Sequence, residues 1–121
     1  MAAMATQDSK ITDEVMAQLR ATHPDAKLRP MVTPMADGTE VEWVMKYPPA
    51  PAAYGAFREK SMESSAAEKA SAPRILFNDM VVFPAGAELK ATIKEWPGFV
   101  DTAAGECAEM AGLVRGTRQA K

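Results

Sequence analysis

Prolines set the lengths of the elements that this chain can form. The 121 residues include nine prolines, and proline fixes φ and lacks the backbone N–H that helices and central strands require. A first helix must therefore end before Pro24, and later elements must stop near Pro48, Pro84 and Pro97. This spacing predicts a fold built from short helices and short strands.

The segment 27–48, KLRPMVTPMADGTEVEWVMKYP, has the pattern of a β-hairpin. Asp37-Gly38 is typical of a two-residue type I′ turn, whose central residues both have positive φ. Pro30 and Pro34 cannot donate to a ladder, so the first strand is expected at an edge with both prolines facing away from its partner. Alternation in the second strand gives an apolar face and a more polar face: Val41, Trp43, Met45 and Tyr47 on the first, and Glu40, Glu42, Val44 and Lys46 on the second.

Helices are expected before and after the hairpin. Thr12 is a suitable N-cap for a first helix within residues 11–23, and Asp13 and Glu14 favour the positive end of that helix. The remaining helices are expected from Pro51 to about Glu63, from Ser65 to Phe83 with a kink or restart at Pro73, from Gly86 to Trp96, and from about Val100 to Leu113.

The length and the order of these elements predict one domain with a modest core. We expect a disordered leader at residues 1–10, a single α+β domain at 11–114 and a basic flexible tail at 115–121. The predicted fold class is α+β, with a short antiparallel β-hairpin packed on a bundle of about four to five short helices.

The composition argues against several classes of protein. The formal net charge is −2, whereas nucleic-acid binders usually present a basic face. The single cysteine, Cys107, excludes an internal disulfide and fits a reducing compartment. The first residues, MAAMATQDSK, lack the order of a signal peptide, and apolar runs are shorter than the ~20 residues needed to span a bilayer. We expect a cytoplasmic protein that binds neither nucleic acid nor membrane.

The sequence contains no recognisable catalytic, cofactor or metal site. His23 is the only histidine and lies far along the chain from Cys107, so neither a zinc site nor a Cys–His nucleophile is favoured. Cys107 falls on a stripe of small residues in a predicted helix, which favours a buried, unreactive thiol. Glycine-rich phosphate-binding motifs are missing from the sequence. We therefore predict no catalytic residue, no metal and no cofactor, in a protein that is not an enzyme.

Methionines and aromatic residues are the candidate functional side chains. The chain has nine methionines, and flexible thioethers either fill gaps in a core or form surfaces that adapt to varied partners. Aromatic residues can likewise build the core or dock a partner. Both interpretations stay open for seven residues: Met31, Met35, Trp43, Met45, Tyr54, Phe57 and Arg58.

The order of several short motifs gives a more specific indication. The strand EWVMKYP leads into a proline-started helix containing YGAFR, followed by the apolar ILFNDMVVFP, a short helix ending in EWPGF and a last helix ending in EMAGL. Over Val41–Leu113 this order resembles the tail assembly chaperones and tail-assembly-chaperone-like proteins of tailed bacteriophages. In that family a W-x-x-K-x-P segment in a short β element precedes a Y-x-x-F-R helix and a mostly helical body.

The resemblance implies a non-enzymatic role in virion morphogenesis. Such proteins hold an aggregation-prone tail component, most often the long tape measure protein, until tail-tube subunits polymerise around it. The implied partner is the tape measure or another tail protein, and the implied location is the host cytoplasm or the virion. Two other hypotheses remain open: a small phage or bacterial inhibitor or adaptor that acts by protein–protein binding, and a minor structural virion protein. An exposed β edge or apolar helix face could also support self-association.

Overall fold

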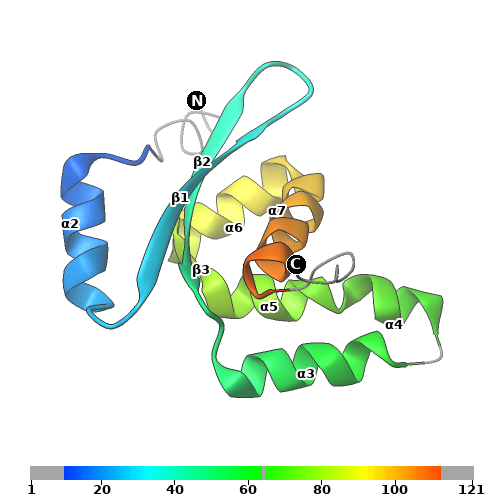
Figure 1. The fold of residues 1–121 in the computed structure, drawn as a ribbon. Coiled ribbons are helices and arrows are strands. Elements are labelled where there is room, and N and C mark those ends of the chain that lie inside the picture. The colour runs from blue at the N-terminus through cyan, green and yellow to red at the C-terminus, as the bar shows by residue number, and fades with distance from the viewer. Residues whose placement is uncertain (1–9, 64, 113–121) are drawn as a thin grey trace, which may run out of the picture.

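The computed structural model describes residues 10–63 and 65–112. In chain order the elements are α2 (Asp13–Thr22), β1 (Lys27–Pro34), β2 (Glu40–Tyr47), α3 (Pro51–Ser61), α4 (Ala66–Ser71), α5 (Pro73–Met80), β3 (Val81–Phe83), α6 (Gly86–Glu95) and α7 (Pro97–Met110). The described strands form one antiparallel sheet in the order β1-β2-β3. Helices α5, α6 and α7 lie on one side of this sheet and α2 lies on the other, while α3 and α4 form an arm alongside α5 (Figure 1). The fold class is α+β, as predicted.

Capping residues begin the helices where the sequence predicted. The Thr12 hydroxyl accepts a hydrogen bond from the Val15 N–H at 3.1 Å, and the Ser65 hydroxyl accepts one from the Glu68 N–H at 3.4 Å. At Pro73 one helix ends and α5 begins, with the proline in the first turn where its missing N–H leaves no helical hydrogen bond unmade. The predicted kink or restart of the helix at Pro73 is therefore confirmed.

The hairpin turn differs from the predicted type I′ turn. Among the described residues, positive φ is confined to glycines, so Gly38 has a φ of +93° but Asp37 does not have the positive φ that a type I′ turn requires. The Met35 N–H instead donates to the Thr39 carbonyl at 2.7 Å, and the Gly38 N–H donates to the Met35 carbonyl at 3.0 Å. The connection is a three-residue loop with glycine in the left-handed position, and the Asp37 carboxylate stabilises it by accepting from the Thr39 N–H at 2.9 Å.

Strand β1 forms an open edge of the sheet, as its prolines predicted. Pro30 lies opposite Val44, and Pro34 lies opposite Glu40. Hydrogen-bonded and non-hydrogen-bonded pairs alternate along antiparallel strands, and a proline can occupy only the position that donates nothing to its partner. Both prolines therefore face the open edge, where they reduce the number of N–H groups available to an added strand.

A third strand replaces the end of a predicted helix. The sequence pattern predicted helix as far as Phe83, but α5 ends at Met80 and Val81–Phe83 is strand β3. Val81 pairs with Met45 and Phe83 pairs with Val44. Two valines and a phenylalanine before a proline favour extended backbone when a neighbouring strand can pair with them. Pairing with β2 therefore overrides the helical pattern at these residues.

The last helix begins earlier than predicted. Helix α7 starts at Pro97 rather than near Val100, because this proline suits the first turn of a helix. The predicted helix end at Leu113 lies outside the described residues. The predicted tail also lies outside them, as does the predicted leader except for Lys10.

Trp43 lies at the centre of the core between the sheet and the helices. Its side chain is fully buried, and its ring centroid lies 6.2 Å from that of Phe77 on α5 and 6.0 Å from that of Phe99 on α7. The indole N–H donates to the hydroxyl of buried Thr33 at 2.9 Å, which satisfies the one polar atom of this side chain. Aliphatic and small residues complete the cluster, including Met45, Leu76, Met80, Ala103, Ala104 and Cys107.

Replacing Trp43 with alanine should lower the free energy of unfolding by about 3–5 kcal/mol, because the change leaves a cavity between the sheet and two helices. Urea denaturation followed by circular dichroism measures this loss. Met62→Ala is the control, since Met62 is 75% exposed and its truncation should change the unfolding free energy by less than about 0.5 kcal/mol. A cost below about 1 kcal/mol for Trp43→Ala would contradict its central position in the core.

Candidate interaction surface

The structure divides the seven residues singled out in the sequence by their burial. The inner face of the hairpin faces α5 and α7, and its side chains pack mainly into the core. Only the exposed parts of its half-buried side chains remain accessible to a partner. Three of the seven are buried core residues: Trp43, Met45 and Phe57. Three more are half-buried and pack against the core: Met31, Met35 and Tyr54. Arg58 is exposed.

Helix α3 brings its two aromatic residues to the edge of the same core. The rings of Tyr54 and Phe57 lie 5.8 Å apart, and α3 packs on α5. Just before α3, the Ala50 N–H donates to the Asp79 carboxylate of α5 at 2.9 Å. This bond fixes the start of α3 against α5. The side chains that surround the Trp43 ring therefore come from α5 and α7, while Phe57 extends the cluster toward α3.

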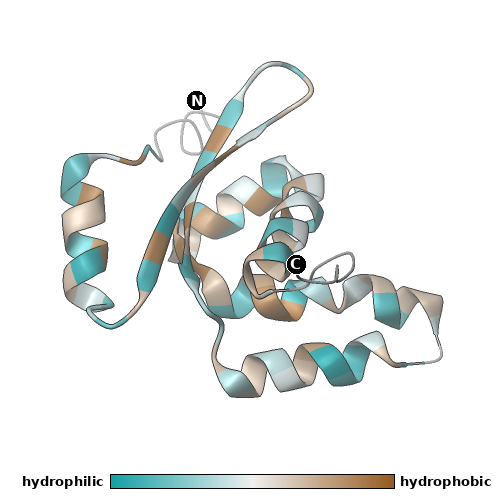
Figure 2. Cartoon of the chain, viewed as in Figure 1, coloured by the Kyte–Doolittle hydropathy of each residue, from teal (hydrophilic) through white to brown (hydrophobic). Residues whose placement is uncertain are grey.

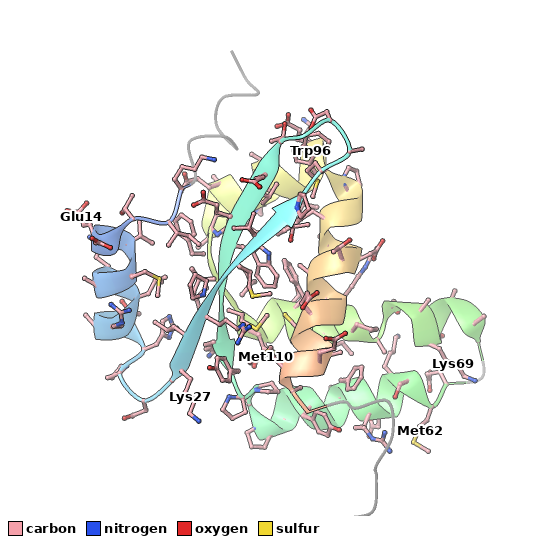
Figure 3. The ribbon with its side chains drawn as sticks, turned by 45° about the horizontal axis from the view of Figure 1, so that its top comes forward. Glu14, Lys27, Met62, Lys69, Trp96 and Met110 are labelled. Carbon is pink, nitrogen blue, oxygen red and sulfur yellow. The ribbon has the colours of Figure 1, made fainter. Side chains whose placement is uncertain are left out.

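One ion pair joins the two helices of the arm formed by α3 and α4. The Lys60 Nζ lies 2.7 Å from the Glu68 Oε2, and this hydrogen bond lowers the pKa of Glu68. Met62 and Lys69 lie at the far end of the arm and point away from the core (Figure 3). A single exposed methionine is ordinary on a protein surface, so we do not assign a site to this arm.

Cys107 and His23, the two residues of the possible nucleophilic pair, lie in different parts of the fold. Cys107 is fully buried in α7, where burial and then the Glu106 carboxylate raise the pKa of its thiol to about 12. His23 follows α2 and lines a shallow hollow of about 350 Å³ together with Lys46 and Tyr47. Within residues 10–63 and 65–112, no three His, Cys, Asp or Glu side chains group in a way that could hold a metal ion.

The outer face of the sheet, which faces α2, is more apolar than the sequence indicated. Pro30 of β1, Val44 of β2 and Phe83 of β3 are paired across it. Val44 is fully buried, whereas Val32 is 51% exposed. Hydrophobic and hydrophilic bands alternate along the strands, as expected when the two faces differ (Figure 2). The outer apolar face is defined here as Leu28, Pro30, Val32, Val44 and Phe83.

Helix α2 lies on the side of the sheet away from α5, α6 and α7 (Figure 1). The Ile11 N–H donates to the Glu42 Oε1 at 2.6 Å, and the Lys10 Nζ lies 3.8 Å from the Glu42 Oε2, so the chain just before α2 is anchored to β2. Glu14 points away from the sheet (Figure 3). Every residue of α2 is exposed or half-buried, and its half-buried residues form one apolar stripe: Val15, Met16 and Leu19.

Sequence reasoning missed the outer apolar face because it assigned Val44 to a row of charged neighbours. Taken alone, the second strand places Val44 with Glu42 and Lys46, which is typical of a solvent-facing row. The pairing of the two hairpin strands was the feature of the sequence that could have revealed this apolar face. Once Pro30 is opposite Val44, the alternation of β1 places Leu28 on the same face.

The described helices are each too short or too polar to cross a lipid bilayer. The sequence matches no protein-family model, and no curated protein matches it. Among solved structures, the chain is similar to the uncharacterised protein rbstp2171 from Bacillus stearothermophilus, with a TM-score of 0.63 and 16% sequence identity. The similarity covers 87% of this chain and 99% of that chain. At this identity the likeness is one of fold.

The thiol of Cys107 should not react with Ellman's reagent at pH 8 while the protein is folded, because a thiol with a pKa near 12 is almost wholly protonated there and is shielded by α7 and its neighbours. The visible absorbance of the coloured thiolate that the reagent releases measures the reaction. In denaturant, one thiol per chain should react. Rapid labelling of the native protein would show instead that Cys107 is accessible and ionised.

Proposed function

We propose that this chain is a non-enzymatic tail assembly chaperone of a tailed bacteriophage, and that it binds the tape measure protein in the host cytoplasm. The observation that carries the proposal is the ordered resemblance over Val41–Leu113. The positions of the motifs in the fold support it: WVMKY lies in β2, YGAFR lies in α3, and PGF opens α7 after a mostly helical middle section. This is the arrangement that the resemblance implies, a short β element followed by a helical body.

The outer apolar face supports a binding role in physical terms. A chaperone of this kind has to hold an apolar segment and later release it, so its contact surface must be apolar but limited in area. Each aliphatic side chain buried by a partner contributes ~1.5–3 kcal/mol before the cost of ordering is subtracted. On the outer apolar face Val44 is already buried and Val32 is 51% exposed, so a partner could bury only a limited apolar area there. A limited area favours moderate affinity, which is compatible with release when tail-tube subunits polymerise.

Co-expression with the tape measure protein of the same phage tests this function. We expect the tape measure protein to remain soluble and to co-purify with this chain, because its apolar segments are covered. The fraction of tape measure protein in the supernatant, with and without this chain, is the measurement. An unrelated coiled-coil protein expressed at the same level serves as the bait control.

Equal tape measure solubility with and without this chain, and no enrichment over the coiled-coil control, would contradict the chaperone function. Mass spectrometry of purified virions separates the remaining hypotheses. A chaperone should be absent from mature particles, whereas a minor structural protein should be present at a fixed copy number. Interference with the host in the absence of any tail gene would favour the inhibitor or adaptor hypothesis.

A further inference from the structure

We draw no further inference here: the strongest candidate, the shallow hollow of about 350 Å³ between the α2–β1 connection and the end of β2, carries none, because the side chains of Lys46 and Tyr47 point to opposite faces of β2 and nothing in the described part of the chain shows which ligand would fill the hollow.

Discussion

The buried indole of Trp43 joins the sheet to the helices, and the arrangement of the other elements depends on that contact. Phe77 and Phe99 approach it from two helices that are distant in sequence, so one side chain on β2 fixes the positions of both α5 and α7. The Thr33 hydroxyl accepts the indole N–H and links β1 to the same centre. Without that acceptor, a buried N–H would cost about 1–3 kcal/mol, so the polar contact and the apolar packing support each other.

The core is centred on one face of the described three-stranded sheet, so the side chains of the other face have different surroundings. The inner face packs on α5 and α7, whereas on the outer face Val32 is half exposed. The two sets of side chains point to opposite sides of the same strands. The packing around Trp43 therefore does not depend on the side chains of the outer face.

Local signals in the sequence predicted the features that depend on local physics. Thr12 and Ser65 cap helices because their hydroxyls reach N–H groups three residues ahead, and Pro30 places β1 at an edge because it has no N–H. Strand β3 could not be predicted in this way, since its residues continue an apolar helical pattern and become extended only through pairing with β2. The outer apolar face was missed for the same reason, because it forms only where the three strands pair.

The hydrogen-exchange rate of the Trp43 indole N–H, followed by NMR, tests the central claim most directly. A fully buried indole bonded to Thr33 should exchange only when the whole domain unfolds, so its exchange free energy should equal the unfolding free energy measured with denaturant. Exchange of this proton through a local opening, several kcal/mol below the global value, would contradict the claim that Trp43 holds the sheet and the helices together.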